Sequence, residues 1–202
     1  MDGILIINKP KGFTSHDVVN VVRKSLNEKK VGHTGTLDPN ATGVLPILIG
    51  KATKVSKYLL EHNKEYIATI ELGKKTDTGD IEGKIIEEDV NVYNVLKNTN
   101  KNKTQEVLTS FIGKQKQIPP IYSAIKINGK KAYEYARQGQ VVEIKPRDIE
   151  ILNIKLLKFL NNEIEFKVTC SKGTYIRTLC EDIAKKLRNN RIYERAYKNK
   201  SR

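Results

Sequence analysis

Residues 149–187, IEILNIKLLKFLNNEIEFKVTCSKGTYIRTLCEDIAKKL, change their hydrophobic period partway along the segment. Two runs typical of strands, at about 149–159 and 164–170, flank an Asn161-Asn162 turn, which predicts an antiparallel hairpin. After SKGT the apolar residues recur at helical spacing and mark one face of a helix: Ile176, Leu179, Ile183 and Leu187. The segment therefore predicts an α+β fold.

The N-terminal part of the chain alternates between strand and helix in the same way. Residues 3–12 predict a short buried strand that ends in a Pro/Gly turn. A helix should follow, with Thr14 as its cap and Asp17 completing a capping box. Its expected inward stripe is Val18, Val22 and Leu26. Residues 31–50 break both periods with glycines and prolines, which predicts an ordered loop, and a second helix is expected at about 53–61.

The middle of the chain predicts further short elements. Residues 66–72 alternate at strand period and precede a turn at 74–83, and the asparagine-rich residues 91–105 predict a loop insertion. A short helix should end at Gly113. An extended piece, an Asn128-Gly129 turn and a helix ended by Gly139 are expected next. We expect no internal repeat and no domain boundary before residue 187.

The composition favours a polyanion as partner. The 202 residues contain 37 Lys and Arg against 23 Asp and Glu, a formal net charge of +14. A basic protein that is merely soluble stays a second interpretation. The residues after Asp182 carry seven of the net positive charges, so about half of the excess lies elsewhere in the chain.

The cysteine pattern and the hydropathy exclude several classes of protein. Cys170 and Cys180 form no CxxC pair and lie near no histidine at ligand spacing, so we expect neither a disulfide framework nor a metal site. No segment resembles a signal peptide or reaches the length of a membrane span. We therefore expect a cytoplasmic chain with no membrane contact.

The segment HTGTLDPNATG, residues 33–43, places an acid in a loop bounded by glycines. Taken alone, Asp38 before Pro39 most often indicates a turn or a cap. A carboxylate that acts as a nucleophile or base needs a cationic partner, and Arg177 in GTYIR is the best candidate. A local helical pair of Arg177 with Glu181, four residues on, is the competing interpretation.

Three other residues could belong to a site, although each has an ordinary structural explanation. Tyr66 and Tyr175 are typical half-buried aromatic residues, but an aromatic ring beside an acid also suits the stacking of an extruded base. His33 by itself favours neither interpretation.

Five motifs together resemble the bacterial tRNA pseudouridine synthase B family. They are ILIINKPKGFTSHDVV, VGHTGTLDPNATGVLPILIGKATK, KEYIATIELGKKTDTGDIEG, IPPIYSAIKINGKKAYEYARQG and CSKGTYIRTLCEDIA. They occur in unbroken order over about residues 1–187. The resemblance implies a pseudouridine synthase catalytic fold, a mixed and largely antiparallel sheet flanked by helices. It also implies isomerisation of the T-loop uridine at tRNA position 55, without a cofactor or a metal.

The resemblance also implies roles for single residues. Asp38 of GTLDP would be the catalytic nucleophile, attacking either the sugar C1′ or the ring C6, and Arg177 would pair with it. Tyr66 would stack on the target base and help the proton transfer. His33 would contact the RNA, and Tyr175 would line the base pocket. Lys9 and Pro10 of NKPKG would support the site.

The C-terminal residues depart from the family pattern. The family continues after GTYIR with an L-R-R-T-R-like stretch and an RNA-binding domain of PUA type, whereas this chain reads KKLRNNRIYERAYKNKSR. We therefore expect a catalytic domain at 1–187 with an incomplete C-terminal part, an aberrant or disordered basic tail at 188–202 and no PUA-type domain. We expect a monomer that acts on the T arm of tRNA. A non-catalytic tRNA-binding protein or tRNA folding chaperone is the alternative, and a structural RNA-binding protein would leave the Asp38 loop unexplained.

Overall fold

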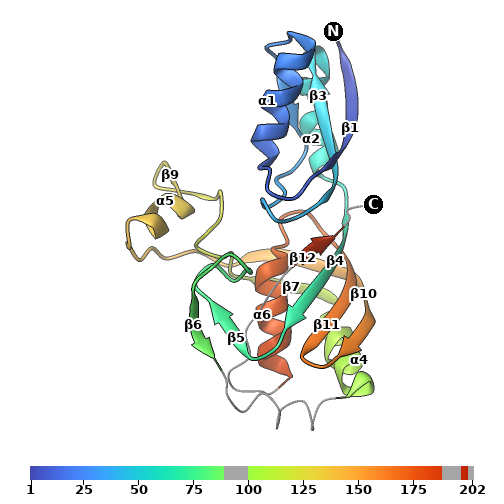
Figure 1. Cartoon of the computed structure of the whole chain (residues 1–202), viewed down its shortest axis with the longest axis vertical. Coiled ribbons are helices and arrows are strands. Elements are labelled where there is room, and N and C mark those ends of the chain that lie inside the picture. The colour runs from blue at the N-terminus through green and yellow to red at the C-terminus, as the bar shows by residue number, and fades with distance from the viewer. Residues whose placement is uncertain (89–99, 188–196, 200–202) are drawn as a thin grey trace. The chain divides into compact units, whose positions relative to one another are not determined.

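The computed structural model describes residues 1–88 and 100–187 and the backbone of 197–199 (Figure 1). The chain forms two compact units, unit 1 with residues 1–67 and 197–202 and unit 2 with residues 68–196. The boundary falls inside strand β4 (Lys64–Glu71). No change of composition marks it, which explains why the sequence predicts no boundary there.

Unit 1 packs a helix against a three-stranded antiparallel sheet in the order β1-β3-β2. The strands are β1 (Gly3–Lys9), β2 (Val31–His33) and β3 (Gly43–Ile49), and the helix is α1 (Ser15–Leu26). A short 3-10 helix, η1 (Gly50–Val55), continues into α2 (Ser56–Leu60), near the predicted second helix. The buried cluster of unit 1 comprises Val18, Val19, Val22, Val31, Leu37, Ala41, Leu45, Ile47 and Ile49.

The predicted start of α1 is confirmed. The Thr14 hydroxyl accepts a hydrogen bond from the Asp17 N–H at 3.0 Å, and the Asp17 carboxylate accepts one from the Thr14 N–H at 2.8 Å. The inward stripe is right for Val18 and Val22, but Leu26 is 36% exposed and Val19 is buried in its place. Leu26 is the last residue of α1, where the helix has passed the edge of the core.

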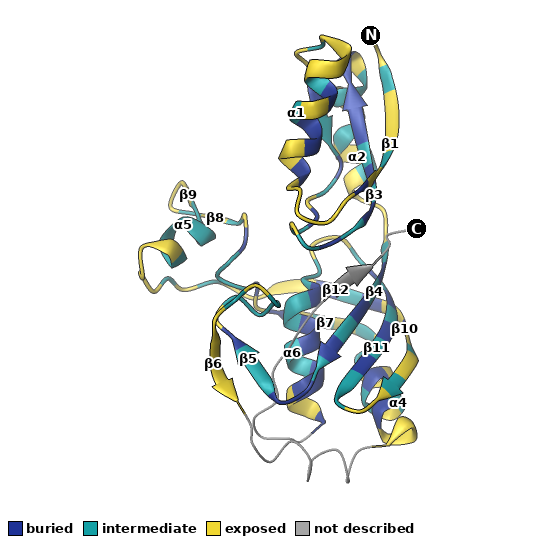
Figure 2. Ribbon diagram, viewed as in Figure 1, coloured by how far each residue is buried: buried dark blue, intermediate teal, exposed yellow. Residues whose placement is uncertain are grey.

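Two predictions for unit 1 are wrong. The first strand was expected to be buried, but in β1 the side chains of Ile4 and Ile6 are 51% and 60% exposed, and much of the strand is exposed (Figure 2). β1 is the outer strand of its sheet, and only Ile7 packs on the core cluster. Residues 31–50 are not all loop, because they contain β2 and β3 on either side of residues 34–42. Pro46 and the flanking glycines conceal the strand pattern of β3.

Unit 2 is built on an antiparallel hairpin, as predicted. Strand β10 (Arg147–Leu160) pairs with β11 (Glu163–Cys170), and Asn161 at the turn has φ 53°. The five-stranded sheet has the order β12-β4-β11-β10-β7, in which β12 and the first half of β4 are counted with unit 1, and β7 (Gly113–Gln117) is antiparallel to β10. The predicted strand alternation of 66–72 is confirmed, because Tyr66, Ala68 and Ile70 are all buried.

Two helices accompany this sheet. Helix α6 (Ile176–Lys186) buries the predicted stripe that begins at Ile176 and continues to Leu187 just after it. Helix α4 (Lys101–Thr109) contacts β10 and α6. It begins earlier than expected, capped by Asn100, and it ends before Gly113, which is the first residue of β7. Residues 101–105 of the expected loop insertion are therefore helical, and 89–99 lie outside the described residues.

Two small hairpins complete unit 2. Strands β5 (Lys74–Thr76) and β6 (Ile85–Glu88) enclose the turn expected after β4. Strands β8 (Lys126–Ile127) and β9 (Lys130–Lys131) are joined by the predicted Asn128-Gly129 turn, with φ of 49° and 86°. Helix α5 (Ala132–Arg137) follows directly.

The expected tail at 188–202 lies mostly outside the described residues. Its described part is the backbone of β12 (Tyr197–Asn199), which lies beside β4 in the sheet. No helix in the described ranges 1–88 and 100–187 is long and apolar enough to cross a membrane.

Candidate active site

The sequence-predicted site residues fall in both compact units. Unit 1 contains the five predicted residues Lys9, Pro10, His33, Asp38 and Tyr66, and unit 2 contains Tyr175 and Arg177. The structure therefore shows how each group is held within its own unit. The pairing of Asp38 with Arg177 stays a prediction.

Asp38 begins a tight turn in the loop between β2 and β3. Its main-chain carbonyl accepts a hydrogen bond from the Ala41 N–H at 3.0 Å, with Pro39 as the second residue of the turn. Leu37 and Ala41, on either side, are 6% and 2% exposed and belong to the core cluster. The loop is thus anchored in the core at both ends, and Asp38 itself is only partly buried.

The main chain on both sides of Asp38 is bonded to residues 9–15. The Ser15 hydroxyl accepts from the Leu37 N–H at 2.9 Å and donates to the Leu37 carbonyl at 3.2 Å. The Pro39 carbonyl accepts from the Gly12 N–H at 2.9 Å. These contacts fix the backbone from which the Asp38 carboxylate extends.

Lys9 is fully buried beneath this loop. Its ammonium donates to the carbonyls of Pro10, Phe13 and Pro39 at 2.9, 2.6 and 3.0 Å. Burial lowers the pKa of Lys9 from its ordinary value of 10.5, and the negative charges of Asp38 and Asp17 act in the opposite direction. The NKPKG turn and the Asp38 loop therefore share one buried cation, which agrees with the supporting role expected for Lys9 and Pro10.

His33, the last residue of β2, is held by its own loop. Its Nδ1 lies 3.0 Å from the Gly35 carbonyl and 3.3 Å from the Gly35 nitrogen. Burial lowers the pKa of the imidazole from its ordinary value of 6.5, the Gly35 hydrogen bond raises it, and the charge of His16 lowers it further. The neutral imidazole is the form that this environment favours.

Tyr66 lies on the buried face of β4 and is 7% exposed. Its position follows from the strand alternation, because every second residue from Tyr66 to Leu72 is buried. The proposed stacking of Tyr66 on a base stays a prediction.

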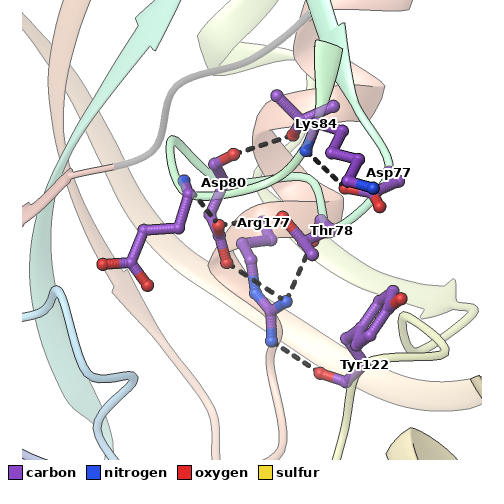
Figure 3. A network of polar contacts seen from close by, with 8 residues as sticks. Asp77, Thr78, Asp80, Lys84, Tyr122 and Arg177 are labelled. Carbon is purple, nitrogen blue, oxygen red and sulfur yellow. Dashed lines mark hydrogen bonds and ion pairs between the residues drawn. The ribbon is translucent and has the colours of Figure 1, made fainter. Parts of the chain in front are cut away.

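Arg177, in the first turn of α6, is the centre of a polar network in unit 2 (Figure 3). Its guanidinium donates to the carbonyls of Thr78 and Tyr122 at 3.0 and 2.8 Å. It also forms an ion pair with Asp80, with 3.7 Å between Nη1 and Oδ2. The arginine side chain is 11% exposed, so these contacts fix the direction of a largely buried cation.

Asp80, the ion-pair partner of Arg177, is not among the residues predicted from the sequence. Its Oδ1 accepts from the Thr78 hydroxyl at 2.9 Å and from the Glu82 N–H at 3.1 Å, and its carbonyl accepts from the Thr76 hydroxyl at 2.8 Å. The acid in the predicted turn KKTDTGDIEG was the available signal, but acids are common in turns. Glu181, the local partner considered for Arg177, pairs with Lys185 at 3.1 Å.

The residue at the N-terminal end of α6 is held by Gln117. The Tyr175 N–H donates to Gln117 Oε1 at 2.8 Å, and Gln117 Nε2 donates to the Tyr175 carbonyl at 3.0 Å. Gln117 is 4% exposed and ends β7. Its amide therefore holds the main chain of the residue directly before α6, whereas the Tyr175 side chain makes no cap hydrogen bond.

Comparisons with known proteins identify the family. The model of the TruB family pseudouridylate synthase (N terminal domain) matches residues 23–176. A tRNA pseudouridine synthase B of Alkaliphilus oremlandii is 55% identical over 187 residues, which cover 93% of this chain and 60% of the relative. One from Oceanobacillus iheyensis is 53% identical over 190 residues, covering 93% and 61%. The chain thus spans about three fifths of the length of these relatives.

Solved structures show the same fold. A protein chain in a crystal structure of a Cbf5-Nop10-Gar1 complex matches with a TM-score of 0.71 and 30% identity, over 98% of this chain and 48% of that chain. A chain in a structure of an H/ACA RNP bound to a substrate RNA containing 2′-deoxyuridine matches with a TM-score of 0.66 and 27% identity, over 97% and 46%. Among the described residues, no group of three or more His, Cys, Asp or Glu side chains is arranged to hold a metal ion. With its pseudouridine synthase fold and a family match over most of its length, the chain belongs to the TruB family of pseudouridylate synthases.

Proposed function

We propose that this chain isomerises the T-loop uridine of tRNA to pseudouridine, with Asp38 as the nucleophile. The observation that carries the proposal is the Asp38 loop, whose main chain is hydrogen-bonded on both sides of the acid. The relatives named tRNA pseudouridine synthase B support the substrate. Residues 1–187 would form the catalytic domain.

The reaction breaks the N1–C1′ bond and forms a C5–C1′ bond. C5 loses a proton and N1 gains one, so the product has the atoms and electrons of the substrate and needs no cofactor or metal. Asp38 would attack either C1′ or C6, and Arg177 would pair with the carboxylate. Tyr66 would stack on the extruded base and assist the proton transfer, Tyr175 would line the base pocket, and His33 would contact the RNA.

A basic and aromatic segment of unit 2 supports RNA as the partner. In the hairpin β8–β9 and helix α5, the Lys131 ammonium and the Arg137 guanidinium lie 5.4 and 5.2 Å from the Tyr133 ring centre. The Lys130 ammonium lies 6.0 Å from the ring centre of Tyr135. Cations interleaved with aromatic rings suit phosphates and unstacked bases. Phosphate contacts would also make the affinity depend on salt.

The proposal places the chain in the cytoplasm as a monomer. Cys170 and Cys180 are buried and are not joined in a disulfide, which fits a reducing compartment.

The test is release of the C5 proton from a tRNA T-arm stem-loop that carries tritium at C5 of its uridines. We expect the purified chain to release tritium catalytically and to leave a stem-loop with cytidine at the target position unreacted. Binding of the stem-loop without tritium release would contradict the proposal and support the alternative, a non-catalytic tRNA-binding protein.

A further inference from the structure

We infer that Ser15 is a positioning residue for Asp38, acting through the backbone of Leu37. The inference rests on the proposed function of Asp38. Ser15 is the first residue of α1, and it is 2% exposed. Both of its hydroxyl hydrogen bonds go to Leu37, one to the N–H and one to the carbonyl.

The two groups bonded by Ser15 lie on either side of the Leu37 Cα, directly before the peptide bond to Asp38. Leu37 is 6% exposed and belongs to the core cluster, so water has little access to its main-chain groups. A buried N–H and carbonyl without partners are costly, and the loop would move to satisfy them. Any such movement passes directly to the Asp38 carboxylate.

Ser15 is also well placed to hold this loop rigidly. The helix that carries it is fixed at its start by the capping box of Thr14 and Asp17. Lys9 holds the other side of Asp38, but its ammonium also bonds the Pro10 and Phe13 carbonyls. A change at Lys9 would therefore disturb the NKPKG turn as well, whereas a change at Ser15 isolates the Asp38 loop.

The inference separates positioning from RNA binding. Ser15 is buried and hydrogen-bonded to the protein backbone, so its loss should leave the contacts with RNA phosphates in place. A displacement of a reacting group by about 1 Å can lower the rate by about 100-fold. The expected signature is therefore a lower kcat with an unchanged KM.

The experiment compares Ser15→Ala, Ser15→Thr and the wild-type chain in the T-arm assay, with Ser25→Ala as a matched control on the exposed face of α1. We expect Ser15→Ala to lower kcat by about 10- to 100-fold at constant KM. Ser15→Thr, which keeps the hydroxyl, should restore most of the rate, and Ser25→Ala should match the wild type. A Ser15→Ala chain with wild-type kcat would overturn the inference.

Amide hydrogen exchange of Leu37 provides a readout that does not need turnover. Loss of its acceptor should accelerate exchange by about tenfold, the equivalent of one hydrogen bond of about 1.4 kcal/mol. If the wild-type chain shows no turnover, the proposed function fails. Unchanged exchange of the Leu37 amide in Ser15→Ala would overturn the inference about Ser15 independently of turnover. Should Ser15→Ala not fold, Ser15→Cys, with a weaker donor of similar size, should show the same acceleration, and unchanged exchange there would be equally contradictory.

Discussion

The Asp38 loop of unit 1 and the Arg177 segment of unit 2 are both held by hydrogen bonds from a buried side chain to the main chain. The side chain is a serine in unit 1 and a glutamine in unit 2. In each, a buried polar side chain bonds both the N–H and the carbonyl of one neighbouring residue: Ser15 with Leu37, and Gln117 with Tyr175. Unit 1 adds a buried cation, Lys9, that bonds main-chain carbonyls around the loop. In unit 2 the cation is the predicted site residue itself, Arg177.

The two segments should therefore differ in how they respond to substitution. The Asp38 loop depends on a charge that lies outside the proposed chemistry, so its fold can be damaged without touching a reacting group. The Arg177 segment combines structure and proposed chemistry in one guanidinium, whereas Gln117 is its neutral support. Substitutions of Lys9 and Gln117 test the two kinds of support.

Lys9→Met should have the largest effect on stability. It removes an ammonium that bonds the carbonyls of Pro10, Phe13 and Pro39 inside a fully buried site. We expect the free energy of unfolding to fall by about 3 kcal/mol, in the range for breaking a buried charged interaction. Urea unfolding measures it, and Lys29→Met at an exposed position is the control. A loss equal to that of the control would contradict the buried-cation account.

Gln117→Leu should have a smaller effect, because the lost group is neutral. It leaves the Tyr175 N–H and carbonyl without the Gln117 amide at the start of α6. We expect a loss of about 2 kcal/mol, mainly from removing the acceptor of the Tyr175 N–H, because the Tyr175 carbonyl keeps its hydrogen bond from the Leu179 N–H at 3.0 Å. Gln117→Glu keeps an acceptor for the Tyr175 N–H but places a buried carboxylate beside the Tyr175 carbonyl, so its unfolding midpoint should also lie below that of the wild type. Equal midpoints for all three chains would show that the Gln117 contact does not support α6.

Much of this architecture could be predicted from the sequence, because it depends on local patterns. The 149–170 hairpin, the stripe of α6 and the capping box of α1 each follow from neighbouring residues. The strands on either side of the Asp38 loop could not be predicted, since Pro46 and glycines interrupt their period. The exposure of β1 depends on its place at the sheet edge, which no local pattern records.

The candidate site likewise contains residues that the sequence could predict and supporting residues that it could not. The motifs marked Asp38 and Arg177, but their supports come from residues distant in sequence: Ser15 lies 22 positions from Leu37, and Gln117 lies 58 from Tyr175. A buried serine or glutamine carries no periodic signal of its own. Asp80 was equally hidden, because its sequence context predicts only a turn.

His33→Gln should give the smallest effect, confined to acid. Because the folded-state pKa of His33 lies below its ordinary value of 6.5, the unfolded chain binds the proton first as the pH falls. The folded state therefore loses stability as the pH drops through 6.5, and His33→Gln should not share this loss. Thermal unfolding of both chains from pH 7.5 to 5 measures the difference. Parallel curves would mean that His33 is not shielded from protonation by its loop.

The most direct test of the account compares Asp38→Asn with the wild-type chain for both turnover and affinity on the T-arm stem-loop, with Asp2→Asn as a matched control. The Asp38→Asn substitution keeps the size of the side chain and the backbone contacts of the loop, but the amide cannot act as a nucleophile. We predict that turnover falls by at least about 10⁴-fold, as when other enzymes lose their nucleophile, while affinity for the stem-loop is retained and Asp2→Asn behaves as the wild type. Turnover by Asp38→Asn at the wild-type rate would contradict the central claim.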